Sequence, residues 1–117
     1  MTSDPTVSNG DVYQVVFEND RVRVLEYTDA PGHRTTIHHH PDSVMYTLSS
    51  FRRRLVSGSS DDTREVEMPA GFVGWLPAQD HAGENIGDTA THVLFVELKE
   101  PASAGDASAS APLGPAG

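Results

Sequence analysis

Three histidines stand at spacings that suit a metal site. His38 and His40 are two residues apart, so in an extended strand both side chains lie on one face while His39 lies on the other. Because a single pair of histidines cannot hold a divalent ion firmly, a metal site needs a third ligand from elsewhere, and His81 is the candidate. Gln79 would share the face of His81, either as a direct amide ligand or as a partner that orients a ligand or a bound water.

Three imidazoles suit Zn²⁺, Fe²⁺, Ni²⁺ or Cu²⁺, and we expect one such ion per subunit, with zinc or iron favoured. Imidazoles are neutral, so a site without an acidic side chain keeps the double charge of the ion and favours an anionic chelating substrate. Enolates, β-dicarbonyls and α-keto acids meet this demand. The ion would act as a Lewis acid that lowers the substrate pKa and holds the oxyanion that forms, which suits isomerase, lyase or cyclase chemistry.

Catalytic groups other than the metal are harder to identify from the sequence. We expect Gln79, Tyr46 and Glu84 to take part in catalysis, the last two only if they line the mouth of the site. His92 could add a fourth nitrogen, although an outward position is favoured for it. Alternatives to a non-redox enzyme are an iron-dependent dioxygenase with the same three histidines and a protein that binds a metal or metabolite without turnover.

The composition limits the class of protein. A chain of 117 residues with 37% hydrophobic residues is expected to form one domain with a modest core, so a homodimer is expected. The net charge of −9 argues against nucleic acid as a partner. There is no cysteine, no apolar stretch long enough to span a membrane and no visible secretory signal, so we expect a cytoplasmic protein that acts on a small molecule.

One basic run, Arg52 to Arg54, interrupts this acidic composition. On a strand its three side chains alternate between faces. They are expected either to be solvated and protect a sheet edge, or to place one arginine at a pocket or a subunit contact.

The pattern of apolar residues predicts an all-β fold. Nowhere do apolar residues recur at helical spacing over a long window, whereas short alternating runs are separated by turn residues. We expect a flexible arm at 1–10, a β-barrel at 11–99 and a disordered tail rich in Pro, Ala, Ser and Gly at 100–117. The expected strands are 12–20, 21–29, 34–40, 43–50, 51–57, 63–68, 72–77, a short strand around 81, and 91–99.

Two motifs resemble those of the cupins, small metal-binding β-barrels. Gly32 precedes the His38-x-His40 pair by the spacing of the first cupin motif, and Gly71, Pro77, His81 and Asn85 follow the order of the second. The resemblance covers about 20–99 and implies a jelly-roll barrel or sandwich that carries a metal ion. It also implies activities that include dioxygenases and zinc-containing cyclases of aromatic polyketides.

The chain departs from the cupin pattern in ways that affect the site. Ser43, Val44 and Met45 occupy the region of the usual glutamate ligand, and His81 arrives one residue early. The resemblance therefore implies the three histidine ligands but no carboxylate on the ion.

Overall fold

The computed structural model describes residues 4–99, which form one short helix and a series of β-strands. The all-β prediction is confirmed. The tail predicted at 100–117 lies outside the described residues. The elements are α1 (Pro5–Ser8), β1 (Tyr13–Glu18), β2 (Val22–Asp29), β3 (His38–His40), β4 (Ser43–Thr47), β5 (Phe51–Ser57), β6 (Thr63–Met68), β7 (Val73–Leu76), β8 (Gln79–Asn85) and β9 (Thr91–Leu98).

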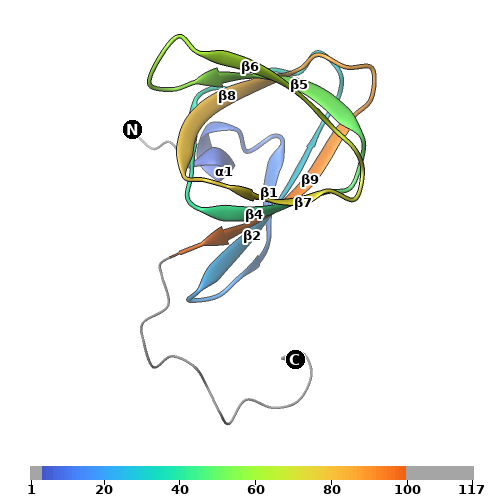
Figure 1. Ribbon diagram of the computed structural model, residues 1–117. Helices are drawn as coiled ribbons and strands as arrows, with labels where there is room; N and C mark the ends of the chain where they lie inside the picture. The colour runs from blue at the N-terminus through green and yellow to red at the C-terminus, as the bar shows by residue number, and fades with distance from the viewer. Residues whose placement is uncertain (1–3, 100–117) are drawn as a thin grey trace.

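The strands form two antiparallel sheets that curve around a common interior (Figure 1). One sheet has five strands in the order β1-β2-β9-β4-β7, and the other has four in the order β3-β8-β5-β6. Neighbours in each sheet are mostly not neighbours in the chain. Only long-range pairing therefore brings the histidines of β3 beside the strand that carries His81.

The core fills the space between the sheets. The buried apolar side chains come from alternate positions of the strands, as expected when one face of each strand points inward. These side chains are Val12, Tyr13, Leu25, Tyr27, Phe51, Val93 and Phe95, with Met45, Met68 and Leu76 packed against them. Two of the ten are tyrosines, so the interior contains hydroxyl groups as well as hydrocarbon.

The N-terminal segment differs from the flexible arm that the sequence predicted. Asp4 caps α1 by accepting a hydrogen bond from the Thr6 backbone, and Asn9 is only 4% exposed. The Asn9 side chain accepts from the Thr36 backbone N–H at 2.9 Å, which ties the segment to the chain just before β3. Within 4–99, no helix is long and apolar enough to cross a membrane.

The strand expected at 34–40 is shorter in the structure, where only His38–His40 is regular. Before it, the chain meets β8 at single points, through a bridge from Arg34 to Glu84 and a bond from the Thr35 N–H to the Gly83 carbonyl at 2.9 Å. Strand β5, with its three arginines, lies between β8 and β6. It is therefore not the sheet edge that one interpretation of the arginine run required.

Candidate metal centre

The two short histidine segments are neighbouring antiparallel strands. The register of β3 and β8 sets His38 opposite His81 and His40 opposite Gln79. One ligand atom from each of the three histidines lies within 4.8 Å of the others, and His38 and His40 are fully buried. His39 points outward, as expected from its position, with Nδ1 2.6 Å from Asp80. The structure thus brings together the three histidines predicted from their spacing.

Hydrogen bonds at Nδ1 fix the orientation of two of the rings. His38 Nδ1 lies 2.7 Å from the Thr36 carbonyl oxygen, and His81 Nδ1 lies 2.7 Å from Oε1 of Gln79. The Gln79 amide is itself oriented because its Nε2 donates to the Pro77 carbonyl at 2.9 Å. The two close partners are acceptors, whereas the Asn9 amide nitrogen lies farther from His38 Nδ1, at 3.3 Å. Each Nδ1 therefore carries the proton and each Nε2 keeps its lone pair.

The third ring, His40, faces a carboxylate that the sequence analysis missed. Oε2 of Glu97 lies 3.7 Å from His40 Nδ1, and Glu97 is only 3% exposed. Its other oxygen accepts from Arg23 Nε at 2.9 Å. The site therefore has an acidic side chain beside it, contrary to the expectation, although this carboxylate is not one of the three grouped ligands. The available signal was the alternation of β9, in which Glu97 follows the buried Val93 and Phe95 at two-residue spacing.

Tyr13 is a second residue that the sequence analysis missed. Its hydroxyl oxygen lies 3.3 Å from His38 Nε2 and 3.2 Å from His40 Nε2. Burial is the largest cause that raises the pKa of this phenol above its usual value. One hydroxyl proton cannot serve two acceptor nitrogens at once. The alternation of β1 alone gave no reason to place this tyrosine, rather than its neighbours, beside the histidines.

Burial keeps two of the histidines neutral at ordinary pH. It is the largest cause that lowers the pKa of His38 to about 4 and that of His81 to about 3, and the electrostatic interaction with His40 is a smaller cause in the same direction. A neutral imidazole is the form that binds a metal ion. These two rings therefore need no deprotonation before a cation can bind.

The donor set fits a divalent cation. Three ring nitrogens converge, and within 4–99 the only side-chain hydroxyl beside their Nε2 atoms is that of Tyr13, which can satisfy one of them. His40 Nδ1 and Glu97 Oε2 are also buried without a hydrogen-bond partner among these residues. Such groups are costly to leave unpaired. A cation shared by the rings would satisfy the nitrogens and strengthen the attraction of His40 for the carboxylate.

The three histidines lie beside a cavity of about 380 Å³. His38 and His81 contribute to its wall, together with Gln79, Tyr13 and Tyr27. The rest of the lining is mainly apolar, including Met45, Leu55, Val66, Met68, Phe72, Trp75, Leu76, Val93 and Phe95. A few polar groups in an apolar cavity are typical of a small-molecule site.

The other catalytic residues expected from the sequence do not line this cavity. Tyr46 is 40% exposed on β4, whereas its neighbour Met45 points inward. Glu84 pairs with Arg34 at 3.4 Å and with Arg54 at 3.7 Å. His92 Nε2 lies 2.6 Å from Glu26 and is not part of the histidine group. Of the three catalytic candidates, only Gln79 lines the cavity.

One arginine of the basic run does reach the pocket. Arg53 lines the cavity and is 8% exposed. Its NH1 donates to Asp29 at 2.6 Å and to Thr91 Oγ1 at 3.1 Å, and its NH2 donates to the Tyr27 hydroxyl at 3.1 Å. Burial alone would raise the pKa of Asp29, but bonds from Tyr27, Arg53 and Asn85 lower it, so the carboxylate stays ionised.

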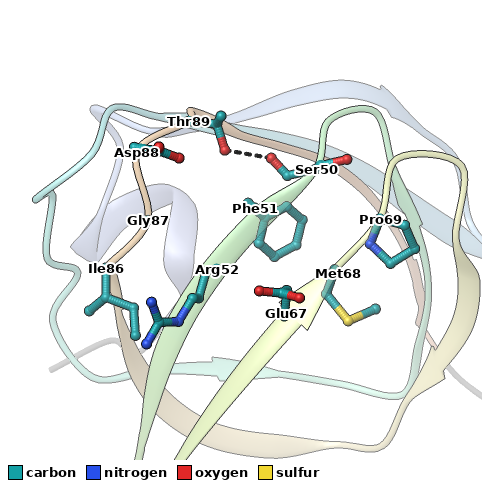
Figure 2. Close-up of a pocket in the computed structure, with 10 residues that line it drawn as sticks. All are labelled: Ser50, Phe51, Arg52, Glu67, Met68, Pro69, Ile86, Gly87, Asp88 and Thr89. Atoms are coloured by element: carbon teal, nitrogen blue, oxygen red, sulfur yellow. Dashed lines mark hydrogen bonds between the residues drawn. The ribbon is translucent and has the colours of Figure 1, made fainter.

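A second depression lies away from the histidines. Figure 2 shows the residues that line it, which are Ser50 to Arg52, Glu67 to Pro69 and Ile86 to Thr89. It is larger, about 760 Å³, but has no histidine and combines Arg52 with the acidic Glu67 and Asp88. Phe51 and Met68 also line the histidine cavity. The chemistry predicted from the sequence therefore belongs to the smaller, inner cavity.

Comparison with known proteins shows the fold. No family model and no curated protein matches the sequence. A cupin domain from Bordetella pertussis Tohama I aligns with a TM-score of 0.68 and 24% identity over 76% of this chain and 93% of its own. The polyketide cyclase RemF from Streptomyces resistomycificus aligns with a TM-score of 0.55 and 21% identity, over 75% of this chain and 64% of its own.

An oxalate decarboxylase is also similar, with a TM-score of 0.52 and 31% identity over 66% of this chain, but over only 21% of its own length. These proteins have the barrel that the two sequence motifs predicted. The chain therefore has the cupin fold.

Proposed function

We propose that this protein is an enzyme that binds one divalent metal ion through His38, His40 and His81 and acts on a small enolisable or carbonyl-containing substrate. The observation that carries the proposal is the convergence of three histidine ligand atoms within 4.8 Å beside an apolar cavity. When bound, the ion would supply Lewis acidity toward a substrate oxygen. Isomerase, lyase or cyclase chemistry follows, and the likeness to RemF makes aromatic polyketide cyclisation one candidate.

The residues around the cavity have separate roles in this proposal. Gln79 holds the ring of His81 from its Nδ1 side, and Glu97 lies where it would support His40 in the same way once an ion is bound. The hydroxyl of Tyr13 lies beside the Nε2 atoms of His38 and His40, where it can donate a hydrogen bond to a substrate oxygen. Apolar side chains such as Phe72 and Leu76 exclude water and so strengthen the electrostatic interactions within the cavity.

Metal analysis of protein purified without an affinity tag tests the proposal. We expect close to one zinc or iron per chain, and we expect the ion to be lost in His40→Ala. His39→Ala is the matched control, because this neighbouring ring points outward to Asp80. Iron together with uptake of O₂ would favour a dioxygenase over Lewis-acid chemistry. A His40→Ala protein that keeps both its fold and its metal would refute the ligand assignment.

A further inference from the structure

The segment before β1 is ordered although its own secondary structure is weak. Helix α1 has only four residues, and a helix of about one turn is not stable by itself in water. Pro5 is nevertheless fully buried, and Asn9 is 4% exposed. The order of residues 4–13 must therefore come from contacts with the rest of the protein, and two of these contacts lead to the histidines.

The first contact runs from Asn9 to His38. Strand β3 lies at the edge of its sheet, and the Asn9 amide bonds to the backbone just before it. Asn9 Oδ1 accepts from the Thr36 N–H at 2.9 Å, and Nδ2 donates to the Thr36 carbonyl at 3.3 Å. The same carbonyl lies 2.7 Å from His38 Nδ1. Asn9 thus fixes the acceptor that orients the ring of His38.

The second contact runs from Asp4 to His40. Asp4 Oδ2 accepts from Arg23 NH1 at 2.9 Å, and Arg23 Nε donates to Oε1 of Glu97 at 2.9 Å. The other oxygen of Glu97 is the one that lies 3.7 Å from His40 Nδ1. Arg23 therefore joins the segment to the carboxylate that supports the second histidine. His81 differs from both, because its partner Gln79 belongs to its own strand, β8.

We propose that residues 4–13 are part of the metal centre, and that docking of this segment and binding of the metal ion stabilise each other. When Nε2 of a histidine binds a cation, its Nδ1–H becomes a better donor. The acceptors of His38 and His40 are the Thr36 carbonyl and Glu97, and these are the groups that the segment holds. Such a coupling is reciprocal, so a segment that is displaced lowers the affinity for the ion.

Asn9 is then a positioning residue that acts on His38 through Thr36. The inference rests on the proposed function for the presence of a metal ion, but it concerns binding of the ion and not the reaction. It therefore has tests that need no substrate.

The affinity for Zn²⁺ tests the role of Asn9. The full chain is freed of metal with EDTA, and zinc binding is measured by competition with a chromophoric chelator. We expect Asn9→Ala to bind zinc about tenfold more weakly than the parent protein. Val7→Ala is the matched control in the same helix, because Val7 is 66% exposed. A purely structural role would destabilise the metal-free and the zinc-bound protein equally and leave the affinity unchanged.

Amide hydrogen exchange in the parent protein decides the question if Asn9→Ala does not fold. The N–H of Ser8 is bonded within the segment, and that of Thr36 is bonded to Asn9. We expect zinc to slow exchange at both by about tenfold more than at Ile86, a difference typical of coupled sites. Ile86 is the control because its N–H donates to the Arg52 carbonyl beside the second depression, away from the histidines.

The outcomes separate this inference from the proposed function. Zinc affinity that is equal in Asn9→Ala and the parent protein would overturn the coupling and keep the metal enzyme. Without a folded variant, equal slowing of exchange at Ser8, Thr36 and Ile86 would do the same. A parent protein that takes up no divalent metal would overturn both proposals. Coupled zinc binding in a protein that converts no enolisable substrate would support the inference and overturn the proposed function.

Discussion

Oε2 of Glu97 lies 3.7 Å from Nδ1 of His40, and neither atom has a hydrogen-bond partner among the described residues. The gap is somewhat longer than a hydrogen bond, as expected for a contact that tightens when His40 Nε2 binds a cation and Nδ1–H becomes a better donor. Glu97 thus lies where a carboxylate can support a ligand without replacing it.

We therefore expect Glu97→Gln to lower the affinity for Zn²⁺ by about 10- to 100-fold, measured by competition with a chromophoric chelator. The uncharged amide of glutamine has the same shape as the carboxylate but stabilises the positive charge on the metal-bound His40 ring less. Glu26→Gln is the control, because Glu26 pairs with His92 outside the histidine group. Equal affinities in the two variants would contradict the role of Glu97.

The stability of the metal-free protein should depend on pH through His38 and His81. Their folded pKa values, about 4 and about 3, lie below the usual histidine value of 6.5 because of burial. At pH values between the folded and the unfolded pKa of each ring, the unfolded chain binds more protons than the folded one. The free energy of unfolding therefore falls as pH falls. The contribution is fully present above about pH 6.5 and is lost progressively as pH falls toward the folded values.

Urea unfolding from pH 7 to pH 5 measures this effect, with an upper limit of about 1.4 kcal/mol per pH unit for each ring. We expect His38→Asn to flatten the dependence, whereas His39→Asn, at an exposed position, should retain it. An unchanged slope in His38→Asn would show that other groups cause the loss of stability at low pH.

The sequence predicted those parts of the site that depend on local spacing. The alternation of a strand was enough to put His38 and His40 on one face and His39 on the other. Residues that reach the site from far along the chain, Tyr13 and Glu97, depend on the pairing of β1, β2 and β9, which no local pattern specifies. Tyr46 illustrates the same limit: the sequence predicted its strand, but not which face of that strand points inward, and Tyr46 lies on the outer face.

Tyr13→Phe should destabilise the metal-free protein more than the metal-loaded one. The hydroxyl lies 3.2 and 3.3 Å from two Nε2 atoms, and its removal leaves both without a donor, at a cost of about 1 to 3 kcal/mol. A bound ion would satisfy the nitrogens instead. Thermal unfolding with and without Zn²⁺ tests this, with Tyr46→Phe at the outer surface as control. An equal loss of stability in both states would mean that the hydroxyl does not act through the histidines.

The homodimer expected from the composition remains a prediction, and the outer face of the five-stranded sheet is where we expect its contact. Val73 and Tyr46 are register partners there and are 62% and 40% exposed. Exposed apolar side chains in one place favour association. Sedimentation should show a dimer that Val73→Lys converts to monomer, while Val56→Lys on the other sheet does not. A monomeric parent protein would contradict the prediction.

Gln79 can be tested as a partner of His81 against the alternative that it is a metal ligand. Its Oε1 accepts from His81 Nδ1 and its Nε2 donates to Pro77, so both ends of the amide are already used within the protein. We expect Gln79→Ala to weaken Co²⁺ binding about tenfold, because the ring of His81 loses its support. Gln79→Glu keeps an acceptor oxygen and should bind at least as tightly as the parent protein. The visible absorption of bound Co²⁺ should be the same in Gln79→Ala as in the parent, since the set of coordinating atoms is unchanged, and a large change in its intensity would identify the amide as a ligand.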